Sequence, residues 1–511
     1  MGRSFYTAAM LQHLFGHALM AASALLLFSA AAIPGSQLRE AGVAKVDITP
    51  DYPIRLTGYA VRKTECEGVA QHIYARALAL GSDKEKPALL ITVDNCGVPV
   101  NVREEVVARL HKEKRLDPAR IAVCSTHTHS APWVRGFAPN IFGGPIPAEQ
   151  QERVDRYTGE LTDYLEAVAL KALAERRPAK LSRGQGHADF AANRRTKGGP
   201  TDHDSPALLV TDPDGTLRAI FTSYACHGTT LGGDYNQICG DWAGYAAEDL
   251  EREHPGAVAL VALGCAGDSN PNPRPGIELA QQHGQAIATA LDAILALGTR
   301  PVEGKLVCHA KQIELPFDTL PTRAEWEARA KETNYAGGHA RLNLARLARG
   351  EKLQTRLPYL VQTWTFGDNL AMVFLAGEVV VDYSLRLKRE LDASRLWVNA
   401  YANDVPCYIP SERILKEGGY EGGGAMIFYD RPTRLAPGVE DRIVATVRQL
   451  LPRGFENPKA EVRDPRESRN PKPETGQRAR KAFHVLRFTL HASPLTRHNS
   501  LVTAHDLPFA I

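Results

Sequence analysis

The sequence has no excess of charge of one sign. Its 511 residues include 61 Lys and Arg against 58 Asp and Glu, which leaves a formal net charge of +3. Proteins that bind nucleic acid usually concentrate basic residues on one surface. We therefore expect no nucleic-acid partner, and no feature of the sequence identifies a protein partner.

The sequence has few long hydrophobic runs, and the longest lies near the N-terminus. Arg3 precedes an almost wholly apolar stretch at residues 18–33, which contains the small residues Ala30, Ala31 and Ala32. This order is typical of a secretory signal peptide, which we predict at residues 1–32; a single uncleaved membrane anchor is the alternative. We expect an exported protein of the periplasm, the extracellular space or the cell surface. Contact with a membrane surface is left open.

The eight cysteines include no Cys-x-x-Cys pair. An exported protein permits disulfides, but their pairing cannot be chosen from the sequence. Cys124, Cys226 and Cys265 each lie near the end of an apolar run, so we interpret them as small buried thiols that pack like apolar residues. Thiolate binding of a metal is the alternative.

Apolar runs alternate with amphipathic stretches along the chain. The sequence predicts strands at residues 42–50, 87–94, 120–125, 217–225, 257–263, 305–315, 370–375 and 396–400, and helices at 101–114, from 241 and at 277–297. We expect Asn101 to cap the first of these helices, and residues 322–352 to form a helical surface insert. Such alternation favours an α/β fold with mixed β-sheets flanked by helices. Residues 453–511 are rich in Pro and charge, which predicts an irregular, disordered tail.

Two histidines, His127 and His129, directly follow the predicted strand at 120–125. If the strand continues through them, positions i and i+2 share one face and both imidazoles look into one cavity. One would then bind a metal and the other would donate a hydrogen bond or support the first. The alternative is a pair of solvated or hydrogen-bonded loop histidines.

Polar groups follow several other predicted strands, among them His227, Asp268 and Glu378. Ligands of α/β sheets bind beyond the carboxyl ends of strands, so we expect these groups to converge there. Two imidazoles and one carboxylate, from His127, His227 and Glu378, form a ligand set that zinc hydrolases use. Glu378 alone also fits a carboxylate at the N-terminus of a helix.

Eight short motifs occur in a fixed order, and together they are far more specific than any one of them. They are Val46-Asp47-Ile48-Thr49-Pro50, Ser125-Thr126-His127-Thr128-His129-Ser130, Ala192-Asn193-Arg194-Arg195, Cys226-His227-Gly228-Thr229, Cys239-Gly240-Asp241, Ala266-Gly267-Asp268, Ala376-Gly377-Glu378, and Tyr408 with Tyr420-Glu421-Gly422. This set resembles the neutral ceramidases, zinc amidases that cleave the N-acyl bond of sphingolipids.

The resemblance implies a ceramidase-like zinc hydrolase domain at residues 42–452. It implies one Zn²⁺ per chain, held by His127, His227, Glu378 and Tyr408. It also implies that the scissile amide is contacted by His129, Arg194 and Tyr420.

The chain departs from the family in two respects. The family has Gly-Asp-Val-Ser-Pro-Asn where this chain has Gly267-Asp268-Ser269-Asn270-Pro271-Asn272, so Asn270 stands in place of an important serine and Ser269 lies beside it. We also expect the family's C-terminal β-sandwich domain to be absent. Both departures leave open whether the substrate is a sphingolipid, another lipid, an amino sugar or a peptide-like amide.

The sequence thus predicts an amidohydrolase in which metal-activated water cleaves a small-molecule or lipid amide. In this hypothesis His129 relays a proton, while Tyr420 and Arg194 stabilise the oxyanion. Asp241 and Asp268 either orient ligands or cap helices and turns. One alternative is a serine hydrolase that uses Ser269, although no Gly-x-Ser-x-Gly surrounds it. Another is an exported, non-catalytic zinc protein that binds a lipid or glycan.

Overall fold

The computed structural model describes residues 38–457. The signal peptide predicted at 1–32 and most of the tail predicted at 453–511 lie outside these residues and stay predictions. The start of that tail is not irregular, however. A 3₁₀ turn at Arg453–Phe455 places the Phe455 side chain in the core, fully buried. Burial of this apolar side chain stabilises a turn within a segment whose composition is mostly charged.

The larger sheet has nine strands in the order β4-β3-β2-β1-β5-β7-β8-β9, with β11 paired to β5. Its members are β1 Arg39–Asp47, β2 Tyr74–Leu80, β3 Ala88–Val93, β4 Ile121–Ser125, β5 Arg177–His187, β7 Asp204–Thr211, β8 Leu217–Tyr224, β9 Val258–Leu263 and β11 Arg300–Pro301. The pairs β3–β4 and β8–β9 are parallel and the other pairs are antiparallel, so the sheet is mixed.

A four-stranded sheet in the order β12-β13-β14-β16 comes from the second half of the chain. It consists of β12 Leu306–Pro316, β13 Arg356–Phe366, β14 Leu370–Leu375 and β16 Leu396–Asn399. Two small sheets complete the β-structure. They pair β6 Ala191–Asn193 with β10 Ser269–Pro271, and β15 Glu378–Val379 with β17 Tyr408–Ile409.

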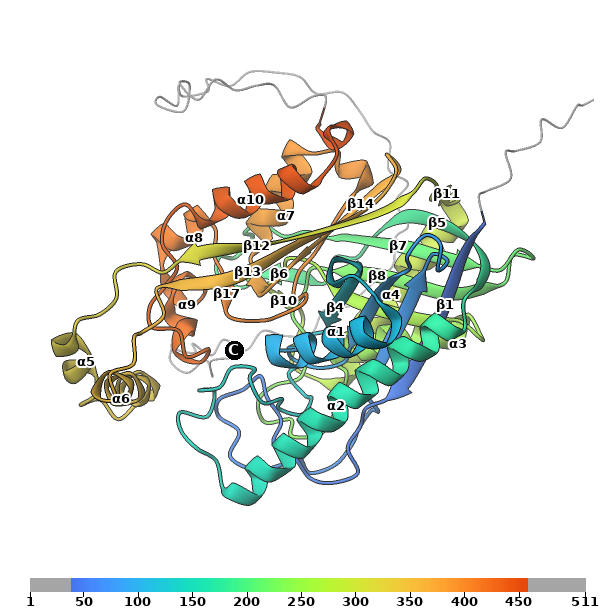
Figure 1. The fold of residues 1–511 in the computed structure, drawn as a ribbon. Helices are drawn as coiled ribbons and strands as arrows, with labels where there is room; N and C mark the ends of the chain where they lie inside the picture. The colour runs from blue at the N-terminus through green and yellow to red at the C-terminus, as the bar shows by residue number, and fades with distance from the viewer. Residues whose placement is uncertain (1–37, 458–511) are drawn as a thin grey trace, which may run out of the picture. The chain divides into compact units, whose positions relative to one another are not determined.

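Helices cover the outer faces of the two large sheets (Figure 1). The larger sheet carries α1 Val100–Lys114, α2 Ala148–Ala174, α3 Asp241–Glu253 and α4 Ile277–Leu297. The four-stranded sheet carries α10 Val439–Leu450, with α7 Val381–Glu390 beside it. The remaining helices lie in connections: α5 Arg323–Arg329, α6 Tyr335–Ala348, α8 Glu412–Glu417 and α9 Gly419–Gly422.

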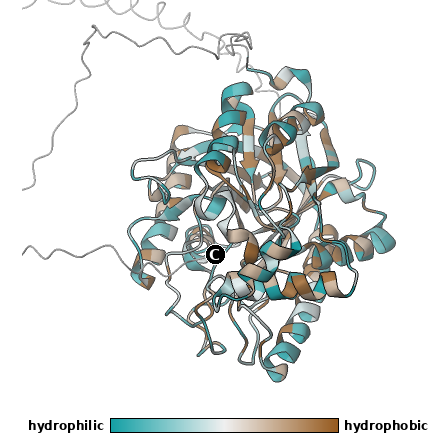
Figure 2. Ribbon diagram, turned by 90° about the vertical axis from the view of Figure 1, so that its left-hand side faces the viewer, coloured by the Kyte–Doolittle hydropathy of each residue, from teal (hydrophilic) through white to brown (hydrophobic). Residues whose placement is uncertain are grey.

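Alternate residues along the strands of the larger sheet belong to two different hydrophobic clusters, one on each face of the sheet. In β2, Leu78 and Leu80 belong to a cluster shared with Trp364 and Phe374 of the four-stranded sheet, whereas Ala77 and neighbouring alternate residues belong to the cluster under the helices. Period-two burial on both faces is the pattern expected of a sheet covered on both sides. Figure 2 shows these strands as largely hydrophobic beneath mixed helices.

The predicted α/β class with mixed sheets is therefore confirmed, and several elements match closely. The helix expected at 277–297 is α4, and the strand expected at 370–375 is β14. The N-cap prediction was wrong. Helix α1 begins at Val100 after Pro99, and the amide of Asn101 instead donates to the carbonyl of Arg135. The sequence interpretation also missed α2, a helix of 27 residues.

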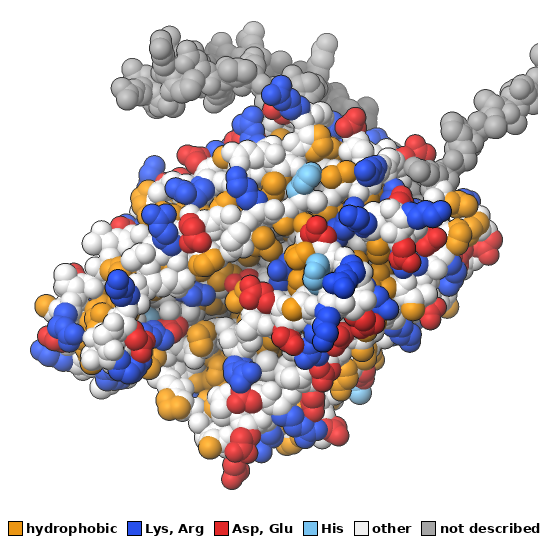
Figure 3. Space-filling view, viewed as in Figure 1, with side chains coloured by type: hydrophobic (Ala, Val, Ile, Leu, Met, Phe, Trp, Pro, Cys, Tyr) orange, Lys and Arg blue, Asp and Glu red, His pale blue; other side chains and the backbone are white. Residues whose placement is uncertain are grey.

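The cysteines bear out the buried-thiol interpretation. Cys124, Cys226 and Cys265 are fully buried, and all eight cysteines of the chain are free thiols. Within residues 38–457, no helix combines the length and apolar character that a bilayer crossing requires. On the face shown in Figure 3, acidic and basic side chains are interspersed.

Candidate metal centre

His127 and His129 do not lie on a strand, which corrects the sequence interpretation. Strand β4 ends at Ser125, and His127 then adopts a left-handed backbone with φ of 54°. The chain is pinned there because the backbone N–H of His129 donates to the carbonyl of Gly228 at 3.0 Å. Both rings are nonetheless buried, and their Nε2 atoms lie 3.1 Å apart. Both are thus loop histidines with hydrogen-bonded rings, as the alternative had it, but burial excludes its solvated form.

His227 follows β8 and meets this pair from the other side. Its Nδ1–H donates to the carbonyl of Ala266 at 2.7 Å, and the Nδ1–H of His127 donates likewise to the carbonyl of Cys96. Because a carbonyl can only accept, each bond fixes the proton on Nδ1 and leaves Nε2 to face the centre. Histidine ligands of metals are commonly oriented in this way.

Glu378 lies in β15, in parallel register with Tyr408 of β17. Its Oε2 is 3.2 Å from Nε2 of His127 and 3.0 Å from Nε2 of His227, and all three side chains are fully buried. The alternative role at a helix N-terminus was wrong. Helix α7 begins later, and Asp268 accepts a hydrogen bond from the backbone N–H of Val381 in its first turn.

Tyr408 and Arg194 complete one side of the centre. The hydroxyl of Tyr408 lies 3.2 Å from Nε2 of His227, and Nη2 of Arg194 donates to that hydroxyl at 3.0 Å. Glu421 fixes the guanidinium by accepting from its Nε at 2.8 Å. The ring of Tyr420 lies 5.4 Å from that of Tyr408, centroid to centroid. The structure thus brings together Tyr408, which the resemblance gives as a metal ligand, and Arg194 and Tyr420, which it gives as contacts of the scissile amide.

Ser269 and Asn270 differ in what they contact. Ser269 is fully buried, and within residues 38–457 its hydroxyl has no hydrogen-bond partner. Asn270 instead accepts through Oδ1 from Nη1 of Arg194 at 3.4 Å and from the hydroxyl of Thr229 at 3.3 Å. The residue in the family serine's place therefore contacts the site arginine, whereas the neighbouring serine hydroxyl contacts no histidine.

Asp241 and Asp268 accept hydrogen bonds mainly from backbone N–H groups, although neither is the N-cap residue of α3 or α7. Asp241 accepts from the backbone N–H groups of Leu231 and Trp242, at 3.0 and 2.6 Å. Asp268 accepts from Val381, as described, and from the side-chain amide of Asn193 at 3.0 Å. These bonds fix the loops that carry the candidate ligands.

Burial and charge set the protonation of the histidines. Burial and the Arg194 guanidinium lower the pKa of His227 to about 4, so its imidazole is neutral at pH 7. Burial, together with His127 and His227, holds the pKa of His129 well below its usual range. Burial also disfavours a charge on His127, but Cys96 and Glu378 outweigh it and raise the pKa of His127 to about 10. The space between His127 and Glu378 thus favours a cation.

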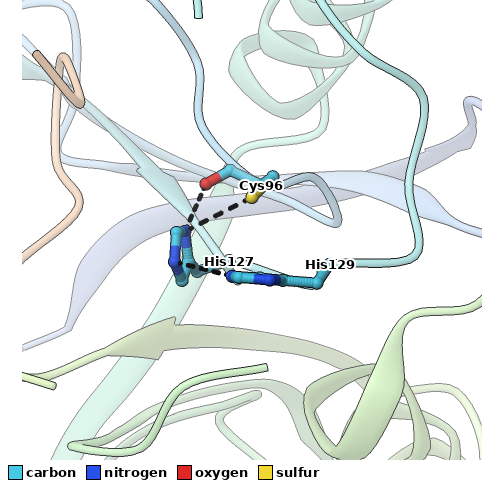
Figure 4. Close-up of side chains that lie close together, drawn as sticks. All are labelled: Cys96, His127 and His129. Carbon is cyan, nitrogen blue, oxygen red and sulfur yellow. Dashed lines mark hydrogen bonds between the residues drawn. The ribbon is translucent and has the colours of Figure 1, made fainter. Parts of the chain in front are cut away.

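Two overlapping groups of metal-capable side chains meet at His127. The first joins it to Cys96 and His129 (Figure 4), but the thiol lies 3.7 Å from Nδ1 while His129 faces Nε2. A single ion cannot bind both nitrogens of one ring, so this group does not form a site. The second group joins His127, His227 and Glu378 through atoms that face one another.

The second group fits a divalent zinc ion. Two imidazole nitrogens and a carboxylate oxygen are preferred donors of Zn²⁺, and the phenol oxygen of Tyr408 lies beside them. The carboxylate oxygen Oε2 of Glu378 is fully buried between the two Nε2 atoms, where a divalent cation would offset its charge. The predicted metal ligands are therefore brought together, and the identity of the ion stays a prediction.

Sequence reasoning missed two residues of this centre. The hydroxyl of Tyr429 donates to Oε1 of Glu378, and the ring of Tyr401 packs 4.4 Å from the ring of His127, centroid to centroid. Neither tyrosine belongs to a spacing pattern that indicates metal binding. Gly58 is also required, since a Cβ there would lie 2.4 Å from the ring of His129.

Comparison with known proteins finds similar sequences in one family. A family model described as neutral/alkaline non-lysosomal ceramidase, N-terminal, matches residues 40–144. The neutral ceramidase of Drosophila melanogaster is 27% identical over 258 residues, which are 45% of this chain and 36% of that protein. That of Drosophila pseudoobscura pseudoobscura is 25% identical over 280 residues, 49% of this chain and 38% of that protein. The resemblance to the neutral ceramidase family is confirmed.

Solved structures show the same fold. The crystal structure of neutral ceramidase from Pseudomonas aeruginosa matches with a TM-score of 0.63 at 19% identity, over 81% of this chain and 75% of that one. A structure of a ceramidase complexed with C2 matches equally well, with a TM-score of 0.63 at 18% identity over 81% and 76% of the two chains. The match spans less than two fifths of the length of the Drosophila relatives, so ceramidase fold and family resemblance are what these comparisons establish.

Proposed function

We propose that this protein is a zinc-dependent amidohydrolase that cleaves an N-acyl amide of the ceramide class. The observation that carries the proposal is the buried Oε2 of Glu378, placed 3.2 and 3.0 Å from Nε2 of His127 and His227. A zinc ion held by these residues and Tyr408 would act as a Lewis acid and lower the pKa of water, as amide hydrolysis at neutral pH requires.

His129 is the proposed proton carrier. Its Nε2 faces the centre, 3.1 Å from Nε2 of His127. A neutral imidazole can accept the proton of the attacking water and deliver it to the amide nitrogen that leaves. The products are a carboxylate and an amine.

Arg194 and Tyr420 are the proposed oxyanion donors. Burial raises the pKa of Tyr420 well above its usual range, so the phenol keeps its proton. Arg194 carries its charge at all relevant pH values, and its guanidinium lies 5.7 Å from the centroid of the Tyr420 ring. Two donors beside one position favour the transition state, in which charge develops on the carbonyl oxygen.

The substrate class is inferred from the relatives. The two Drosophila relatives are named neutral ceramidases, and a structure of similar fold is described as a ceramidase complexed with C2. We therefore propose a lipid amide as substrate. Asn270 beside Arg194 is the specific observation that favours a second candidate, a zinc protein that binds such a lipid without cleaving it. Export from the cell stays a prediction.

The decisive experiment is hydrolysis of a panel of N-acyl amides by the purified protein, with bound zinc quantified. The panel contains ceramides of two acyl lengths, an N-acyl amino sugar and an N-acyl amino acid. We expect fatty acid release from ceramide that a chelator abolishes and added Zn²⁺ restores. Stoichiometric zinc without turnover of any amide would favour the binding protein, and turnover that survives complete removal of metal would contradict the zinc assignment.

A further inference from the structure

Tyr429 is a buried residue whose hydroxyl contacts the candidate metal centre indirectly. Its side chain is 2% exposed, and the hydroxyl donates to Oε1 of Glu378. The other carboxylate oxygen, Oε2, is the one that faces His127 and His227. A carboxylate with one oxygen held in this way presents its second oxygen in a fixed direction.

The segment that carries Tyr429 is itself anchored from two sides. On one side the Asn140 side chain donates to the carbonyl of Ile427 at 2.8 Å, and its backbone N–H donates to that of Phe428 at 3.0 Å. On the other side Arg346 of α6 donates through Nη1 to Oδ1 of Asp430 at 2.7 Å. The position of the phenol is thus held by contacts on both sides of Tyr429 that do not involve the metal centre.

We propose that Tyr429 is a positioning residue that orients Glu378 for a divalent cation. The proposal rests on the proposed function, since it takes the ion between Glu378 and the two histidines as given. Removing the hydroxyl would leave Oε1 unpaired and free the carboxylate to rotate. Partners that orient metal ligands from outside typically contribute 10- to 100-fold to metal affinity, by order of magnitude.

Tyr383 provides a matched control for this role. It is also a fully buried tyrosine, and its hydroxyl donates to the carbonyl of Pro410 at 3.1 Å rather than to a candidate ligand. Tyr383→Phe and Tyr429→Phe each remove one buried hydroxyl with one hydrogen bond. A general effect on packing lowers stability in both variants, whereas an effect on ligand orientation weakens zinc binding only in Tyr429→Phe.

The test measures the zinc dissociation constant of wild type and both variants by competition with a chromophoric chelator, with thermal unfolding of the metal-free proteins alongside. We expect Tyr429→Phe to weaken zinc binding about 10-fold or more, and Tyr383→Phe to stay within about 2-fold of wild type. Equal affinities in Tyr429→Phe and wild type would overturn the positioning role. Absence of zinc binding by wild type would instead overturn the metal site of the proposed function.

A second variant decides the question if Tyr429→Phe does not fold. Arg346→Gln loosens Asp430 from α6 and changes no group of the metal centre, and the Arg346 side chain is 31% exposed. We expect this variant to bind zinc more weakly than wild type, but by less than the loss of the phenol causes. Unchanged zinc affinity in folded Arg346→Gln, with no folded Tyr429→Phe, would reject the role.

Discussion

The two halves of the chain hold their candidate ligands in different ways. The first half contributes His127 and His227, and each Nδ1–H donates to a backbone carbonyl. The second half contributes Glu378 and Tyr408, which are held by side chains, Glu378 by Tyr429 and Tyr408 by Arg194. A carbonyl at a strand end moves only if the sheet moves, whereas a side-chain partner is lost by a single substitution. The imidazoles are therefore fixed by the fold, and the oxygen ligands by individual residues.

His227→Ala tests the half that the fold fixes and is expected to have the largest effect. The variant removes one nitrogen donor but leaves the carbonyl of Ala266 and the flanking sheet in place. We expect loss of nearly all bound zinc and a decrease in amidase turnover of about 10³-fold or more, the scale expected when a metal centre is lost. Zinc content, turnover and far-UV circular dichroism check this outcome.

His72→Ala is the control for that substitution. This histidine is exposed, pairs with Asp47 at the surface and does not belong to the candidate metal centre. Its replacement should change neither zinc content nor turnover. Full zinc content in His227→Ala would show that the ligand set is wrong.

Tyr420→Phe tests the second half of the chain, in which individual side chains hold the groups of the candidate site. The ring remains beside Tyr408 and Arg194, so the fold and the zinc content should be kept. Loss of one donor to a developing oxyanion typically lowers kcat about 10²- to 10³-fold. We expect such a decrease in kcat with little change in KM. A decrease in zinc content that accounts for the lost turnover would assign Tyr420 to metal binding instead.

The place of each residue relative to the strands explains what the sequence could predict. His127 and His227 stand directly after apolar runs that form β4 and β8, and a strand end places such a group by topology alone. Tyr429 contacts Glu378 across 51 positions of the chain, within a loop that has no periodic pattern. Contacts of this kind depend on tertiary packing and leave no local signal.

Several predictions of local structure were wrong for a related reason. The strand was expected to run through His127 and His129, but the backbone turns at His127 and brings the two rings together through a bend rather than a pleat. Hydrophobic periodicity in the sequence indicates which face of a regular helix or strand is buried. It does not show where that element ends in a turn. Helix α2 escaped prediction because much of its surface is charged, although its buried face includes Tyr157 and Leu161.

Two aspartates near the centre repeat the contrast and differ in pKa. Asp404 accepts at Oδ1 from the backbone N–H of Val100, and burial raises its pKa to about 6. Burial also opposes ionisation of Asp430, but His339 and Arg346 outweigh it and lower the pKa of Asp430 to about 2. At Asp404 the backbone contact and the charge of Arg431 do not offset burial, whereas at Asp430 the side chains of His339 and Arg346 outweigh it.

Asp404→Asn sharpens this contrast with a moderate effect on stability. The folded pKa of Asp404 lies above its ordinary value of 3.8, so its stabilising contribution is complete below that value and is lost as the pH rises through about 6. The variant keeps an acceptor and carries no charge. We expect its free energy of unfolding to exceed that of wild type by about 2 kcal/mol at pH 8 and to equal it at pH 4. Urea unfolding at both pH values measures the difference, and an equal gain at pH 4 would contradict a charge effect.

Ser269→Ala is expected to have the smallest effect and tests the serine alternative. The hydroxyl is fully buried and, among the described residues, bonds to neither a histidine nor a carboxylate, so water rather than Ser269 is the expected nucleophile. Turnover and zinc content should stay within about 2-fold of wild type, and stability should change by about 0.5 kcal/mol or less because no hydrogen bond is broken. Asn270→Ala alters the contact with Arg194 and should lower turnover more. Loss of turnover in Ser269→Ala with zinc retained would instead identify the serine as nucleophile.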